Sequence, residues 1–248
     1  MDKLHVVKRG FVKEDKQQFT DSSLEKLKEA AKDTKYLLNR GYPVKGVTTF
    51  IGNHFMFSER QRLALARAVS SDYDIGKRKS KQCIFEGCNE VFQTYDREES
   101  LIEEVFIDGF NTIITLEVAL SGSPVLKCMD GTMRDLAGLR GTYRIIDKTK
   151  KVVCLIMEYL VRLNIQKAVF YLDAPVSNSG RLKTFILEIA QKYTLDVSVE
   201  VINNVDSVLQ RLGGVITSDA IILNHCKSYI NLLSAIISEM ENVWIVEL

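Results

Sequence analysis

The chain has 248 residues, of which 46% are hydrophobic and 26% are charged, and 33 lysines and arginines oppose 32 aspartates and glutamates. This composition is typical of a soluble globular protein, and it excludes collagen-like and low-complexity classes. The five cysteines are odd in number and irregularly spaced, which excludes a disulfide framework. No apolar run reaches the roughly 20 residues of a membrane span, and the first residues lack the apolar stretch of a secretory signal. We therefore expect a cytoplasmic protein with no membrane partner.

The near-neutral total charge hides two halves of opposite sign. Residues 1–97 carry 19 basic and 13 acidic side chains, a net charge of +6, whereas residues 98–248 carry 14 and 19, a net charge of −5. A basic surface attracts polyanions such as nucleic acids. We predict two domains, a basic helical module with a linker over 1–97 and a second domain over 98–248.

Two helices are predicted in the N-terminal module. Residues 21–40 follow a helical period and end before Gly41, and Ser58 and Gln61 form a capping box that opens a helix over 58–71. The segment after Gly41 is ambiguous, because it is β-branched and contains two glycines.

Three arginines are predicted on the exposed face of the second helix, namely Arg60, Arg62 and Arg67. They are the candidates for contact with a nucleic-acid backbone. After this helix, residues 72–82 are polar and basic and indicate a linker or exposed loop. Residues 83–92 indicate a short strand or hairpin, and residues 97–104 indicate a helix turn.

From residue 103 onward, apolar β-branched strands alternate with helices. The predicted strands are 103–108, 124–129, 167–173, 196–202, 214–219 and 242–248, and the predicted helices are 111–121, 148–163, 179–193, 204–212 and 220–240. Such alternation predicts an α/β domain, in which a mostly parallel sheet lies between two layers of helices in a Rossmann-like three-layer arrangement.

Polar residues follow four of these predicted strands, and each set includes an aspartate. The four are Asp108, Asp130, Asp173 and Asp219. Because ligands bind beyond the carboxyl ends of parallel strands, we expect the four carboxylates to meet at one edge and to hold Mg²⁺ or Mn²⁺. For any single aspartate the competing interpretation is an ordinary helix N-cap.

Further residues near these strand ends are candidates for positioning a phosphate. They are Asn111, Ser177, Asn178, Ser179, Ser218 and Arg134. Gly109 is expected to let the backbone approach a ligand closely. Glu117 is expected on the surface, and Asp206 is expected to cap or decorate a helix.

Three segments resemble the PIN-like nuclease superfamily, including its NYN branch. They are EEVFIDGFN (103–111), KAVFYLDAPVSNSG (167–180) and GVITSDAII (214–222). The resemblance implies that Asp108, Asp173 and Asp219 bind Mg²⁺ or Mn²⁺ and cleave RNA, less often DNA. Many PIN-like sites carry another acid just after the late aspartate, where this chain has Ala-Ile-Ile.

The N-terminal segment YLLNRGYPVKGVTTFIGNHFMFSERQRLALARA (36–68) resembles a domain of unknown function in an uncharacterised, largely archaeal family. In that family the domain is joined to a PIN-like domain. No activity follows from this second resemblance.

The leading hypothesis is a metal-dependent nuclease that acts on RNA, with Asp108, Asp173 and Asp219 as catalytic residues. One alternative is a non-catalytic nucleic-acid-binding or regulatory protein on a PIN-like scaffold. Another is a phosphohydrolase of small molecules. The sequence leaves a homo-oligomer open.

Overall fold

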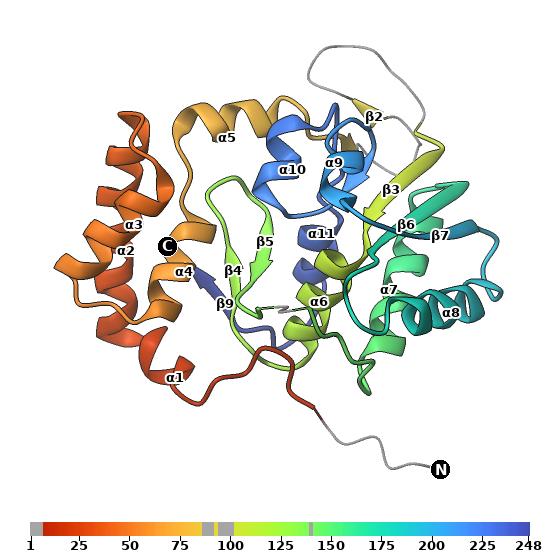
Figure 1. The fold of residues 1–248 in the computed structure, drawn as a ribbon, viewed down its shortest axis with the longest axis horizontal. Coiled ribbons are helices and arrows are strands. Elements are labelled where there is room, and N and C mark those ends of the chain that lie inside the picture. Colours follow the sequence, from red (N-terminus) through yellow and green to blue (C-terminus); the bar gives the residue numbers. More distant parts are fainter. Residues whose placement is uncertain (1–6, 86–91, 94–101, 139–140) are drawn as a thin grey trace.

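A computed structural model describes residues 7–85, 92–93, 102–138 and 141–248. The fold is α/β (Figure 1). The N-terminal helices, red to orange in the figure, lie on one side, and a four-stranded parallel sheet lies on the other. A second, three-stranded sheet stands between them.

The N-terminal segment forms five helices within the described residues. They are α1 (Asp15–Gln18), α2 (Asp21–Asn39), α3 (Val44–His54), α4 (Glu59–Ala68) and α5 (Asp72–Lys79). The two predicted helices are confirmed. Gly41 follows α2 with φ +83°, and Ser58 and Gln61 form the expected reciprocal capping box of α4. The ambiguous segment is the helix α3, and Pro43 directly precedes it.

The linker or exposed loop predicted over residues 72–82 is wrong, since residues 72–79 form α5. The Ser71 side chain caps the helix by accepting a hydrogen bond from the backbone N–H of Asp74, and Arg78 is buried. Beyond it, β1 (Ile84–Phe85) pairs antiparallel with β2 (Phe92–Gln93), as in the hairpin alternative. Residues 86–91, and most of the helix turn predicted over 97–104, lie outside the described residues.

Four strands form the parallel sheet in the order β7–β6–β3–β8. They are β3 (Glu104–Asp108), β6 (Lys167–Asp173), β7 (Asp196–Ile202) and β8 (Val215–Ile216). Asp108 lies opposite Tyr171, and Asp173 lies opposite Ile202. The carboxyl ends of all four strands therefore face the same edge of the sheet.

Helices cover both faces of this sheet, so the expected three layers are present. Ile107 and Phe170 point into a large core that contains residues of α6 (Gly109–Leu120), α7 (Thr149–Arg162), α8 (Ser179–Ala190) and α11 (Leu232–Ser238). Phe106 and Tyr171 point to the opposite face, where α9 (Val205–Leu209) and α10 (Ala220–His225) pack.

The single helix predicted over residues 220–240 is wrong. The segment between α10 and α11 is extended and runs beside β8, where the Ile230 N–H donates to the Val215 carbonyl at 2.8 Å and the Val215 N–H donates to Ser228 at 3.1 Å. β3 pairs with one side of β8, and these hydrogen bonds satisfy the backbone groups on its other side.

Two predicted strands do not join the parallel sheet. β4 (Val125–Lys127) pairs antiparallel with β5 (Met133–Asp135) and parallel with β9 (Ile245–Glu247) in the second sheet. Leu126 and Val246 from this sheet share a buried core with Leu27 and Leu65 of the N-terminal helices. The N-terminal module is thus packed against strands from the second half of the chain. None of the helices in the described ranges combines the length and hydrophobicity that a membrane span requires.

Candidate functional site

Each of the four parallel strands leads to an aspartate at its carboxyl end. Asp108 and Asp173 are the last residues of β3 and β6, and Asp219 follows β8 and caps α10. The fourth is Asp206, in the first turn of α9, which begins shortly after β7. The sequence predicts only that Asp206 caps or decorates its helix. Asp206 lies four residues after the end of β7, however, and Asp219 lies three residues after the end of β8, so the two positions are comparable.

Asp108 is the most buried of the four, with 7% of its surface exposed. Its carboxylate accepts a hydrogen bond from Thr217 Oγ1 at 2.9 Å and a longer one from the Asn111 N–H at 3.4 Å. Burial raises the pKa of Asp108 to about 7, and the negative charges of Asp219 and Asp206 add to this rise. Asp108 is therefore close to half-protonated at neutral pH.

Asp219 and Asp206 repel the charge of Asp108, and Asp173 is linked to this group through Asp206. Burial and the negative charges of Asp219 and Asp173 raise the pKa of Asp206, and burial raises the pKa of Asp173. Asp219 Oδ1 accepts hydrogen bonds from two N–H groups of α10, at 2.7 and 3.1 Å. Its Oδ2 accepts none from the described residues.

No lysine or arginine in the described ranges forms an ion pair with any of the four aspartates. Uncompensated carboxylates attract a divalent cation, and Mg²⁺ typically binds one or two carboxylates and several waters. The oxygen-only donor set of Asp108 and Asp219 fits this requirement. Across the described residues, however, no three acidic, histidine or cysteine side chains converge into a preassembled metal cage.

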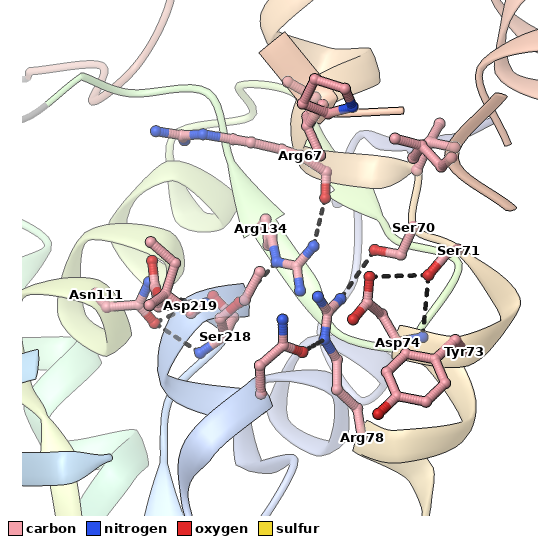
Figure 2. Close-up of a pocket in the computed structure, with 18 of the residues that line it drawn as sticks. Arg67, Ser70, Ser71, Tyr73, Asp74, Arg78, Asn111, Arg134, Ser218 and Asp219 are labelled. Atoms are coloured by element: carbon pink, nitrogen blue, oxygen red, sulfur yellow. Dashed lines mark hydrogen bonds between the residues drawn. The ribbon is translucent and has the colours of Figure 1, made fainter. Parts of the chain in front are cut away.

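Asn111 and Ser218 hold the turn after β8 against the start of α6. Asn111 Oδ1 accepts hydrogen bonds from the backbone N–H and the hydroxyl of Ser218, at 2.9 and 3.1 Å. Arg134 Nε donates to the Ser218 carbonyl at 2.6 Å (Figure 2). These contacts bring three predicted residues together, and they fix the distance between the strand ends that carry Asp108 and Asp219.

The predicted phosphate loop at the start of α8 is instead occupied by internal hydrogen bonds. Ser179 is buried and its hydroxyl donates to the Asp173 carbonyl at 2.7 Å, while the Asn178 amide donates to the Tyr143 carbonyl at 2.6 Å. Ser177 is exposed. Ser179 thus positions the backbone at Asp173, and Asn178 holds the backbone at Tyr143.

The structure does not place Asp130 with the other aspartates, because its strand belongs to the second sheet. The Asp130 carboxylate is 1% exposed, pairs with Arg78 at 2.6 Å and with Arg134, and accepts hydrogen bonds from Thr132. Burial alone would raise its pKa, but Arg134, Thr132 and Arg78 outweigh burial and lower it. Asp130 is a structural ion-pair centre and no metal ligand.

The three arginines predicted to bind nucleic acid are engaged in internal contacts. Arg60 forms an ion pair with buried Asp15 and donates to the carbonyls of Gly10 and Leu136. Arg62 lies over Gly52 of α3 and donates to three oxygen atoms of that region, belonging to Phe57, Thr49 and Asn53. Arg67 contacts Asp135. The predicted exposure of these three side chains for nucleic-acid contact is therefore wrong, and they hold α4 against its neighbouring segments.

Glu117 is also buried, contrary to the expected surface position. It forms an ion pair with Arg9 at 2.8 Å and accepts a hydrogen bond from the Tyr143 hydroxyl at 2.9 Å. Burial raises its pKa. Gly109 likewise has a packing role, because a Cβ there would lie 2.5 Å from Leu172 Cδ2.

A cleft of about 1050 Å³ opens beside the aspartates, between the N-terminal helices and the rest of the chain. Asn111, Ser218 and Asp219 form one end of its wall, and Arg67, Arg78 and Arg134 line its centre (Figure 2). Arg78 lies in a segment for which the sequence predicts a linker or exposed loop, and only the fold brings it to the cleft.

In comparisons with known proteins, the chain is similar to families and to a protein whose functions are unknown. The family described as "Domain of unknown function (DUF5616)" matches residues 98–235, and "Protein of unknown function (DUF434)" matches residues 26–81. "Uncharacterized protein MJ0935" of Methanocaldococcus jannaschii is 36% identical over 204 residues, which is 81% of this chain and 89% of that protein. No solved structure matches the chain significantly. Because the first match covers more than half of its residues, the chain belongs to the DUF5616 family.

Proposed function

We propose that this protein is a PIN-like, metal-dependent nuclease that hydrolyses phosphodiester bonds of RNA at the aspartate-bearing edge of the parallel sheet. The observation that carries the proposal is that all four strands deliver an aspartate to one edge and that no described cation pairs with any of them. The resemblance of residues 103–111, 167–180 and 214–222 to PIN-like nucleases supports it.

In this proposal Asp108 and Asp219 hold Mg²⁺ or Mn²⁺. The ion, when bound, lowers the pKa of a bound water and neutralises charge on the phosphoryl oxygens. The Thr217 hydroxyl and the Asn111 N–H orient the Asp108 carboxylate, and two N–H groups of α10 orient the Asp219 carboxylate. Asp173 and Asp206, whose carboxyl groups bind protons more readily than usual, would accept a proton from the attacking water.

The test is cleavage of labelled single-stranded and duplex RNA and DNA in Mn²⁺ by wild type, Asp108→Asn and Asp219→Asn. We expect each variant to lose at least about a hundredfold in rate, since it removes a ligand of the activating metal. Asp196→Asn is the matched control, because Asp196 is an exposed residue at the opposite, amino end of β7. Equal cleavage by wild type and Asp108→Asn would contradict the proposal, as would no cleavage of any polymer.

A second candidate is a non-catalytic nucleic-acid-binding protein. It is favoured by the lack of a preassembled three-ligand cage among the described residues. This candidate expects salt-sensitive binding of RNA that persists in Asp108→Asn and needs no metal. Turnover of small phosphate esters without action on polymers would select a phosphohydrolase instead.

A further inference from the structure

The cleft beside the aspartates has the size and the aromatic rim of a nucleotide site. We propose that it binds one unpaired nucleotide, with the base against Tyr42 and Tyr73 and the phosphate against Arg78 and Arg134. The inference rests on the proposed function, because it names the substrate class of that same site as single-stranded nucleic acid.

Of the four aspartates, Asp219 lines the cleft. Asn111 and Ser218, which hold the turn before Asp219 against α6, also belong to the cleft wall. The volume of about 1050 Å³ lies at the upper end of ordinary ligand pockets. A nucleotide therefore fits with space for the chain to enter, and its neighbouring phosphate is directed toward Asp219.

The floor of the cleft presents preorganised guanidinium groups. Arg78 and Arg134 are 3% and 6% exposed, and Asp130 holds both. Arg78 uses Nε for Asn224 and Nη1 for Ser70 and Asp130, and among the described residues its Nη2 finds no acceptor. Guanidinium groups form strong charge-assisted hydrogen bonds with phosphates, and Arg78 Nη2 is the donor that this cleft offers to one.

The mouth of the cleft carries two exposed aromatic rings. Tyr42 and Tyr73 are 57% and 76% exposed, and both line the cleft. Figure 2 shows Tyr73 beside Asp74, at the end of the row of polar side chains that starts at Asp219. Exposed aromatic rings beside a cationic groove are the stacking surfaces of proteins that bind single strands. Asp74 at this rim is a hydrogen-bond acceptor for a base amino group or a ribose hydroxyl.

A base that stacks on Tyr42 and Tyr73 has left the base stack of a duplex. The geometry thus favours single strands over duplexes of the same sequence. The shared chemistry, a nucleoside phosphate, also occurs in free nucleotides, and the experiment separates the two sources.

The test is fluorescence anisotropy of a labelled RNA of about ten nucleotides, a length within the range that single-strand sites cover. Binding is measured in EDTA, so that cleavage does not interfere. The variant is Tyr42→Ala with Tyr73→Ala, two exposed positions whose change leaves the core intact. Tyr36→Ala is the matched control, because Tyr36 is 58% exposed, packs on Arg40 and lies outside the cleft.

We expect the double variant to bind the single strand about five- to a hundredfold more weakly than wild type, as loss of base stacking predicts. Tyr36→Ala should bind as wild type, and the duplex should bind weakly to all three proteins. Displacement of the RNA by micromolar mononucleotide would identify a free nucleotide as the ligand, and resistance to it would identify the polymer.

Three results would overturn the inference: no binding of the single strand or of a mononucleotide by wild type, unchanged binding by the double variant, or equal weakening by Tyr36→Ala. Failure of the proposed function is separate. If wild type cleaves no polymer but binds single strands through the two tyrosines, the nucleotide site stands and the nuclease does not.

Discussion

Asp108 combines burial, helix capping and repulsion from neighbouring carboxylates in one side chain. Because the pKa of Asp108 lies at about 7, a metal ion must displace its proton at lower pH. We expect the apparent Mn²⁺ affinity of wild type to rise with pH, by up to about tenfold per pH unit below 7, and to level off above it. Calorimetric titrations over this pH range check the expectation. Asp108→Asn is the reference, and its residual affinity should vary less; parallel pH profiles would argue against Asp108 as a ligand.

Asp130 shows the opposite behaviour, since two arginines stabilise its charge. Replacing it in Asp130→Asn leaves Arg78 and Arg134 buried beside a neutral partner, which costs about 3–5 kcal/mol of the unfolding free energy at neutral pH. The lowered pKa of Asp130 makes its stabilising charge fully present above the ordinary value of 3.8 and lost as pH falls below it. The difference between wild type and Asp130→Asn should therefore shrink in acid. Urea unfolding at neutral and at acid pH measures it, and a difference that grows in acid would contradict the ion-pair role.

At the scale of single residues, local signals were predictable and distant ones were not. Asp108 and Asp219 both stand where a strand meets a helix, and both accept hydrogen bonds from the first turn of that helix. Arg60 looks exposed on a helical wheel, but its partners Asp15 and Leu136 are 45 and 76 residues away. The spacing of residues within α4 does not predict those contacts.

At the scale of elements, the start of α6 packs against β6 so closely that only glycine fits at residue 109. In Gly109→Ala the new Cβ would meet Leu172 Cδ2 at 2.5 Å and the Tyr171 carbonyl oxygen at 2.9 Å. Because one of these atoms is backbone, α6 must shift, and we expect a loss of about 1–3 kcal/mol in unfolding free energy together with weaker Mn²⁺ binding at neighbouring Asp108.

Thermal melts with and without Mn²⁺ measure both effects. The matched control is Gly76→Ala in α5, where no atom lies within 4 Å of the new Cβ. An alanine in the middle of an exposed helix gains about 0.5–1 kcal/mol over glycine, so this control should melt higher than wild type. Equal melting temperatures for Gly109→Ala and wild type would show that the contact at β6 is not tight.

Elements with strong apolar periodicity were predicted from the sequence, whereas those fixed by tertiary contacts were not. α5 is polar and basic, and its only buried residue is Arg78. The Arg78 side chain donates hydrogen bonds to Asn224 and Asp130, which lie far from it in the sequence. β4 has the β-branched and apolar character of a parallel strand, but the turn at Gly131, with φ +82°, folds the chain back as a hairpin. Only the observed pairing of β4 with β5 and β9 shows which sheet this strand joins.

At the scale of the whole molecule, the N-terminal helices and the second sheet share one core, and we expect a single unfolding transition. Leu65 is fully buried in that core together with Leu126 and Val246. Leu65→Ala should cost about 2–5 kcal/mol, and it should lower the melting of the entire chain. The only tryptophan, Trp244, packs against this core, so its fluorescence reports on it while circular dichroism reports on all helices. Coincident transitions support one cooperative unit, and two separated transitions would refute it.

The pairing of β4 with β9 has a consequence for the order of events during synthesis. About 180 residues separate Leu65 of α4 from Val246 of β9, yet the two side chains belong to one core. As the chain leaves the ribosome, the N-terminal helices emerge early. Their apolar surface stays exposed until β9, the last strand of the second sheet, has been synthesised and can cover it. Nascent chains that stop before residue 245 should therefore expose this surface and recruit chaperones, whereas those that extend past residue 248 bury it.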